Sequence, residues 1–230
     1  MAKFTFTLDT KYFIPLAVVA AGAMIAIAIL YTGGVKIAAV KPEVGIAELK
    51  TGGEPYLGNP DAKVKIVYYG DFQCPFCKRF ESVALPEIKS RYLDSGKAVF
   101  YFKNFQFLGQ DSVTAGIAGE CAIKQSKGNL DSYWKLHNAM FEKQDAENAG
   151  FGSADDIKNL VRELNLGINL AEFDKCLDSR ETEEEVLADT TEGRNDGVTG
   201  TPANFINGKL IPGAQAASVF VAEIEKSFSQ

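Results

Sequence analysis

The chain has 230 residues, 46% of them hydrophobic and 23% charged, and its formal net charge is −6. Such a composition is typical of one sizeable globular domain with an appendage, and it excludes a wholly disordered chain. Lys and Arg do not cluster as a phosphate-binding face requires, so we do not expect nucleic acid as a partner.

An uncharged apolar run over residues 13–31 predicts an uncleaved transmembrane anchor. At 1.5 Å per residue, a helix of this length spans about 28 Å, close to the hydrocarbon thickness of a membrane. A cleaved signal peptide is the alternative, but its apolar region is shorter and ends in a small-residue cleavage pattern. We therefore expect a short N-terminus (1–12), the anchor (13–31), a linker (32–55) and a folded domain (56–230). Lysines on both sides of the span leave its orientation open.

The folded domain carries alternating strand and helix signals. β-Branched and aromatic residues predict strands at 63–69 and 98–102, with a helix over about 74–93 that Pro86 kinks or breaks. Helical signals fill about 108–195. An Asn-Gly turn predicts a hairpin over 201–211, and an amphipathic helix closes the chain at 219–228. This order predicts an α/β fold, with a central mixed sheet flanked by helices and a helical insertion.

The predicted insertion divides into several helices. They are expected near residues 111–125, 131–143, from 153 onward, 169–177 and 181–191. Ser153 with Asp156 three positions later is a weaker version of a capping box, which marks the start of the third helix.

Two of the four cysteines, Cys74 and Cys77, lie three residues apart at the start of the first predicted helix. This spacing puts both sulfurs on one helical face, within reach of a disulfide. The helix N-terminus, together with Lys78 and Arg79, is expected to lower a thiol pKa. Cys74 should be exposed and act as the attacking or attacked sulfur, and the more buried Cys77 should resolve the mixed disulfide. Pro75 stiffens the turn between them.

Other interpretations of these residues remain open, and one is an inert structural bridge between Cys74 and Cys77. A zinc site would need a second ligand pair of similar spacing, whereas Cys121 and Cys176 are isolated and His137 is the only histidine. The distant cysteines are either a structural bridge or core residues. Pro202 at a strand start has a functional interpretation as a cis X–Pro bond, and a trans proline opening an edge strand is the alternative.

Two motifs in the right order carry a family resemblance. Residues 57–62 and 70–77 (GDFQCPFC), followed by 197–202 (GVTGTP) and 205–208 (FING), resemble the DsbA-like branch of the thioredoxin superfamily. The likeness covers about residues 55–228. It implies a thioredoxin-like fold, a cis Pro202 that faces the cysteine pair, and Thr201 presenting its backbone to substrate. Some relatives have a second disulfide at similar places, so the resemblance also implies a bridge between Cys121 and Cys176. Two free buried thiols are the alternative.

The sequence departs from that family at two positions. Phe76 lies where many oxidants carry His, and losing a donor to the thiolate should make a weaker oxidant. Tyr68 lies six residues before the first cysteine, where relatives often have a buried acid. Asp71 supports the active site as a turn-forming residue, with a proton-handling role as the alternative. His137 is expected to be a packed residue, with a catalytic role as the alternative.

The resemblance implies a thiol–disulfide oxidoreductase on the extracytoplasmic side of the cell membrane, single-pass with its N-terminus inside. It would donate the Cys74–Cys77 disulfide to unfolded or cysteine-containing secreted proteins and be reset by a membrane redox partner. We expect no metal or organic cofactor, because the electrons travel through sulfur. We also expect a monomer. A disulfide reductase or isomerase with the same centre is the alternative, and a non-catalytic module that holds unfolded clients is a further one.

Overall fold

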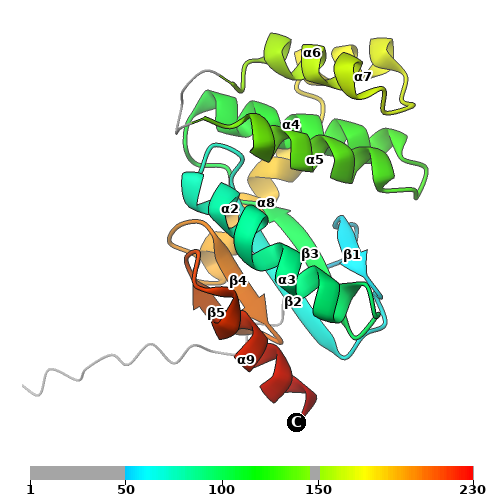
Figure 1. The fold of residues 1–230 in the computed structure, drawn as a ribbon. Coiled ribbons are helices and arrows are strands. Elements are labelled where there is room, and N and C mark those ends of the chain that lie inside the picture. Colours follow the sequence, from blue (N-terminus) through cyan, green and yellow to red (C-terminus); the bar gives the residue numbers. More distant parts are fainter. Residues whose placement is uncertain (1–49, 146–150, 230) are drawn as a thin grey trace, which may run out of the picture. The chain divides into compact units, whose positions relative to one another are not determined.

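The computed structural model describes residues 50–145 and 151–229 (Figure 1). Within them, five strands form one sheet in the order β1-β3-β2-β4-β5. Strands β2 and β3 are parallel to each other, and the other neighbouring pairs are antiparallel. The predicted central mixed sheet is therefore confirmed. The strands are β1 (Tyr56–Gly58), β2 (Val64–Gly70), β3 (Ala98–Asn104), β4 (Ala203–Ile206) and β5 (Lys209–Pro212).

The helix after β2 contains two wider, π-helical turns. It consists of α2 (Pro75–Arg79), a π turn (Phe80–Ala84), α3 (Leu85–Ile88) and a second π turn (Lys89–Leu93). The predicted range is correct, but the chain does not break at Pro86. Instead, the N–H of Leu85 bonds to the carbonyl of Phe80, five residues back, directly before the proline that has no N–H.

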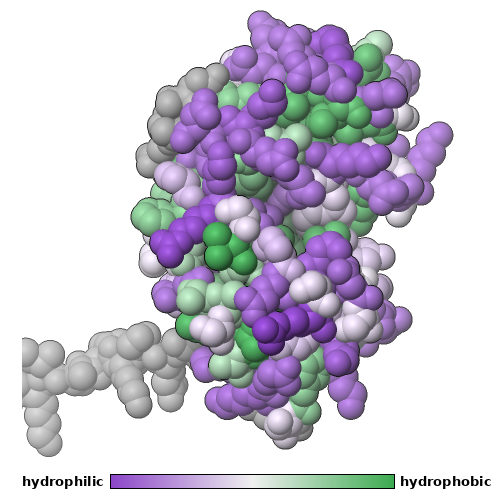
Figure 2. Space-filling view, in the orientation of Figure 1, coloured by the Kyte–Doolittle hydropathy of each residue, from purple (hydrophilic) through white to green (hydrophobic). Residues whose placement is uncertain are grey.

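The predicted helical insertion is confirmed. Its helices are α4 (Gln110–Gln125), α5 (Asp131–Lys143), α6 (Ala154–Leu164), α7 (Leu170–Asp178) and α8 (Glu183–Asn195). Ser153 and Asp156 form the predicted reciprocal capping box at the start of α6. Helices α6 and α7 lie over α4 and α5, and on the face shown in Figure 2 their outer surface is mostly hydrophilic.

The last elements form the predicted hairpin and helix. Asn207 and Gly208 both have positive φ, as a two-residue turn between β4 and β5 requires. Helix α9 (Ala217–Phe228) then packs on β2 and β4.

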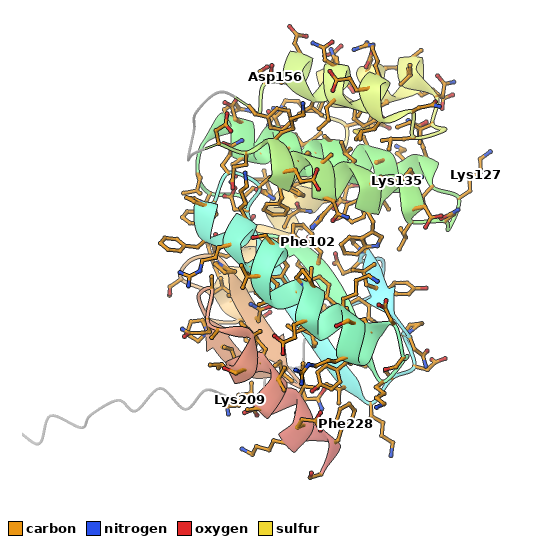
Figure 3. All side chains as sticks on the ribbon, in the orientation of Figure 1. Phe102, Lys127, Lys135, Asp156, Lys209 and Phe228 are labelled. Atoms are coloured by element: carbon orange, nitrogen blue, oxygen red, sulfur yellow. A yellow bond between two sulfur atoms is a disulfide. The ribbon has the colours of Figure 1, made fainter. Side chains whose placement is uncertain are left out.

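Alternate residues of the central strands face two different cores. Ile66, Tyr68 and Phe102 belong to the larger core, which packs beneath α2, α3, α5 and α9. Phe102 lies inside this core, between the sheet and the helices (Figure 3). Tyr69 and Phe205 belong to a smaller core on the other side of the sheet. The active-site helix therefore covers the larger of the two cores.

The first strand begins at Tyr56, and residues just before it also contact the domain. Strand β1 is absent from our prediction because three residues ending in Gly58 carry little strand signal. Pro55, placed in the linker, accepts a hydrogen bond from the N–H of Phe102 at 3.0 Å. Glu54 lies 3.2 Å from the ammonium of the buried Lys103. At least the last two residues of the predicted linker thus belong to the domain.

Between residues 50 and 145 and between 151 and 229, no helix is both long and apolar enough to cross a membrane. The predicted N-terminus (1–12), the anchor (13–31) and linker residues 32–49 lie outside the described residues, and they stay predictions.

Candidate active site

Cys74 lies where strand β2 gives way to helix α2. The strand ends at Gly70, a turn follows, and the N–H of Cys74 donates to the carbonyl of Asp71 at 3.0 Å. Cys74 is the N-cap of α2 and Pro75 is the first helical residue, a position where a missing N–H costs nothing. The sulfur of Cys74 therefore lies at a helix N-terminus, where backbone N–H groups favour a thiolate.

The second predicted motif meets the first in space. The Thr201–Pro202 bond is cis, and β4 begins at the next residue. The thiol of Cys74 donates to the carbonyl oxygen of Thr201 at 3.4 Å. The structure thus brings together Cys74, Thr201 and Pro202 from the two ends of the domain.

The prediction that Cys74 is exposed is wrong. Its exposed fraction is 5%, and that of Cys77 is 0%. Cys74 is covered because the backbone of Thr201 lies against it, a long-range contact that no local pattern shows. The exposed residue of the motif is Phe76, at 60%.

The pKa values of the two thiols move in opposite directions. The pKa of Cys74 is lowered to about 6, first by a hydrogen bond from Cys77, then by the side chain of Thr201 and the backbone N–H groups of Cys77 and Phe76, while burial opposes the shift. Burial raises the pKa of Cys77 well above its ordinary value, and its hydrogen bond to Cys74 and the charge there add to this. At neutral pH the pair therefore holds one thiolate, on Cys74, and one thiol, on Cys77.

Asp71 is fully buried beneath the active-site turn. Its carboxylate accepts hydrogen bonds from the N–H groups of Gln73 (2.8 Å), Phe107 (2.9 Å) and Leu108 (3.2 Å) and from the hydroxyl of Ser112 (2.7 Å). Burial raises its pKa, and these hydrogen bonds oppose the shift. Such a set of donors favours the turn-forming role, because the carboxylate ties the turn to the loop after β3 and to α4.

Several polar side chains join the helical insertion to this turn through hydrogen bonds. The sequence patterns do not predict them. Gln73 donates to the carbonyl of Phe151 at 2.7 Å, and Gln144 donates to the carbonyl of Phe72 at 2.6 Å. The ammonium of Lys78 donates to the carbonyl of Gln144. Lys78 therefore binds the end of α5. The expectation that its positive charge acts beside Cys74 is wrong.

The remaining singled-out residues lie in the insertion. Cys121 on α4 and Cys176 on α7 form a disulfide with an S–S distance of 1.97 Å. His137 is fully buried among the rings of Phe72 and Phe102, with its Nε2 3.1 Å from Glu81. This is the environment of a packed histidine.

Comparison with known proteins agrees with this geometry. Residues 50–226 match the model of the thioredoxin family. This chain belongs to the thioredoxin family. Within it, the chain is a DsbA-like protein-disulfide oxidoreductase, as the sequence motifs predicted.

The relatives of this oxidoreductase include proteins of disulfide bond formation. It is 36% identical over 154 residues to the probable disulfide bond formation protein D of Bacillus anthracis, which covers 67% of this chain and 70% of that protein. It is 31% identical over 159 residues to the disulfide bond formation protein D of Bacillus subtilis, which covers 69% of this chain and 70% of that protein.

Solved structures confirm the thioredoxin-like fold of this oxidoreductase. The crystal structure of oxidised BdbD from Bacillus subtilis superposes with a TM-score of 0.72 at 28% identity, covering 79% of this chain and 96% of that one. The structure of α-DsbA1 from Wolbachia pipientis shares the fold with a TM-score of 0.67 at 22% identity, covering 79% of this chain and 94% of that one.

Proposed function

We propose that this oxidoreductase is an oxidase that donates the Cys74–Cys77 disulfide to unfolded, cysteine-containing secreted proteins. The observation that carries the proposal is the position of Cys74 at the N-terminus of α2 and against Thr201, where its pKa is lowered to about 6 beside the raised pKa of Cys77. A Cys74 thiolate that is stable at neutral pH stabilises the reduced protein. A couple whose reduced form is stabilised gives its disulfide away.

The exchange proceeds in two balanced steps. A substrate thiolate attacks the sulfur of Cys74, the Cys74–Cys77 bond breaks, and its electron pair leaves on Cys77. A second substrate thiolate then attacks the substrate sulfur of the mixed disulfide, and the electron pair leaves on Cys74. The low pKa of Cys74 makes it a good leaving group in this second step. The substrate loses two electrons to sulfur alone, and no metal or organic cofactor takes part.

The neighbouring residues have supporting roles. Pro202 begins the β4 hairpin, and Thr201 presents its backbone beside the sulfur of Cys74, where a bound substrate would lie. Pro75 shapes the first helical turn, and Asp71 holds the preceding turn in place. Phe76, exposed between the cysteines, offers an apolar surface to the client.

A reductase or isomerase using the same centre is the second candidate, and Phe76 is the observation that favours it. The phenyl ring of Phe76 has no donor to offer the Cys74 thiolate. Without one, the reduced form is less favoured than in an oxidant that has such a donor.

The location and partners follow from the same chemistry. An oxidase of secreted proteins works in an oxidising compartment, so the catalytic domain lies outside the cytoplasm and residues 13–31 anchor it with the N-terminus inside. A membrane redox partner removes the two electrons after each cycle, and the oxidase acts as a monomer. Protease added to intact cells would then digest the domain, whereas a cytoplasmic domain would survive.

The test uses the full chain in detergent, oxidised beforehand, and a reduced, unfolded client protein with several native disulfides. The oxidase proposal predicts that client thiols disappear as Cys74 and Cys77 become reduced. Cys74→Ser should abolish the transfer, and the variant Lys89→Met, on the exposed surface, should leave it unchanged. The proposal fails if the oxidised chain leaves the client reduced while its reduced form cleaves insulin disulfides.

A further inference from the structure

Tyr68 on strand β2 carries a buried hydroxyl that no described residue satisfies. Its side chain is fully buried, and among residues 50–145 and 151–229 its hydroxyl oxygen has no hydrogen-bond partner of acceptable geometry. Aromatic rings surround it, with those of Phe80 at 4.8 Å and Phe102 at 5.5 Å between centroids. An unpaired buried hydroxyl costs free energy, so its presence in an apolar core needs an explanation.

The helix above Tyr68 places Cys77 close to this hydroxyl. Phe80, whose ring packs on that of Tyr68, lies three residues after Cys77, and such residues share one helical face. Both Cys77 and Tyr68 are fully buried in the same core. The pKa of Cys77 agrees with this placement, because the Tyr68 hydroxyl lowers it against the larger effect of burial. The unpaired hydroxyl therefore lies in the same buried core as the sulfur that must become negatively charged during exchange.

We propose that the Tyr68 hydroxyl donates a hydrogen bond to Cys77 when that sulfur is a thiolate, and so speeds the steps in which Cys77 attacks or leaves. This inference rests on disulfide exchange at Cys74–Cys77 and deepens the proposed function, but it does not depend on the direction of electron flow.

The chemistry of each step balances without a proton from tyrosine. When the Cys74–Cys77 bond breaks, its electron pair goes to Cys77, and the O–H of Tyr68 turns toward that charge. Burial raises the pKa of Tyr68 well above its ordinary value, so the proton stays on oxygen and the thiolate later takes one from solvent. A neutral donor at this position stabilises the thiolate without placing a second negative charge beside it, as a carboxylate would.

An aromatic disulfide probe, 5,5′-dithiobis-(2-nitrobenzoate), separates the two cysteines in the reduced full chain. In the first phase Cys74 attacks the probe and one coloured nitrothiobenzoate is released. In the second phase the Cys77 thiolate attacks the sulfur of Cys74, the internal disulfide forms, and a second nitrothiobenzoate leaves. Tyr68→Phe should leave the first phase unchanged and slow the second by about three- to tenfold near neutral pH, because Cys77 is a thiolate less often.

A matched control lies next along the strand. Tyr69 is equally buried but faces the other core, where its hydroxyl donates to Asp196 at 2.8 Å. Tyr69→Phe also removes one hydroxyl, and both phases should keep their wild-type rates. Tyr68→Phe should unfold at no lower denaturant concentration than the wild type, since its hydroxyl lacks a partner.

Two results would overturn the inference about Tyr68. One is a second phase of wild-type rate in Tyr68→Phe, and the other is an equal slowing of both phases. The oxidase proposal is tested apart from this, by the reduction potential of the wild-type chain. A potential near that of thioredoxin would end the oxidase proposal and leave a selective loss in the second phase standing.

Discussion

The carbonyl oxygen of Thr201 lies 3.4 Å from the sulfur of Cys74, although the two residues are 127 positions apart in the chain. This contact joins the hairpin half of the domain to the helix that carries the cysteines. Cys74 is also nearly covered, with an exposed fraction of 5%. The chemistry at Cys74 therefore depends on both ends of the domain.

The first prediction concerns the pH dependence of the reduced protein. The pKa of Cys74 is lowered to about 6, well below the ordinary value of a cysteine thiol. A thiolate with a depressed pKa stabilises the folded reduced form above the unfolded pKa, and this contribution is lost as pH falls through the folded pKa. The free energy of unfolding of the reduced form, relative to that of the oxidised form, should thus decline as the pH falls from about 9 to about 6.

Two measurements check this. Thiolate absorbance of the reduced chain should show half-titration near pH 6, and Cys74→Ser should remove that transition. Denaturant unfolding of both redox forms across the same pH range should show the decline in the reduced form only. Parallel curves for the two forms would contradict the lowered pKa of Cys74.

The second prediction concerns Phe76. Replacing it with His places a donor next to the Cys74 thiolate, which should lower the pKa of Cys74 further and make the couple more oxidising. Because Phe76 is 60% exposed, the change should cost little stability. Phe76→Ala removes the ring without adding a donor and serves as the control. Equal potentials for the His and Ala variants would mean that the side chain at this position does not reach the thiolate.

The third prediction concerns the disulfide between Cys121 and Cys176, which are separated by 55 positions. Loop-closure entropy for a loop of this length predicts that Cys121→Ala with Cys176→Ala loses about 4 kcal/mol of unfolding free energy. The double variant should keep the wild-type potential of the active-site couple, since the bridge joins α4 to α7 within the insertion. Chemical unfolding and glutathione equilibration measure the two quantities, and a shifted potential would show coupling between the disulfides.

The fourth prediction concerns the buried Lys103 on β3, whose ammonium lies 3.2 Å from carboxylate oxygens of Glu54, Asp189 and Glu192. Lys103→Met should cost about 3–5 kcal/mol, because it leaves buried carboxylates without their cation. Lys89→Met, which removes an exposed pair with Asp94, should cost less than about 1 kcal/mol. Equal losses in the two variants would show that the buried cluster does not depend on Lys103.

The same cluster gives that defect a pH dependence. Burial raises the pKa of Glu54 to about 8, and Lys103 opposes the shift. A carboxyl with a raised pKa destabilises the fold as pH rises through its unfolded and then its folded value. The loss caused by Lys103→Met should therefore be larger at about pH 8 than at about pH 5.

The sequence predicts the elements near the active site well because their signals are local. The Asn207-Gly208 turn requires positive φ at two successive positions, and only a few residue types favour it. The cysteine spacing and the helix start at Pro75 likewise depend on neighbouring residues. The resemblance adds the cis bond before Pro202, which no periodicity predicts.

The missed features all depend on contacts between distant segments. The burial of Cys74 comes from Thr201, and the fastening of the insertion comes from Gln73 and Gln144, whose partners lie more than 70 positions away. Lys78 next to the motif suggested a charge effect, but its side chain binds a carbonyl at the end of α5. Local sequence patterns predict which helix, strand or turn contains these residues. They do not predict which distant residues become their hydrogen-bond partners.

The reduction potential of the Cys74–Cys77 couple tests the central proposal most directly. The full chain is equilibrated with glutathione buffers, and the fraction of reduced Cys74 is measured by alkylation. The double variant Cys121→Ala, Cys176→Ala is the control. An oxidase requires a potential well above that of thioredoxin, which is about −270 mV. A value at or below that of thioredoxin would contradict the proposal and identify the protein as a reductase.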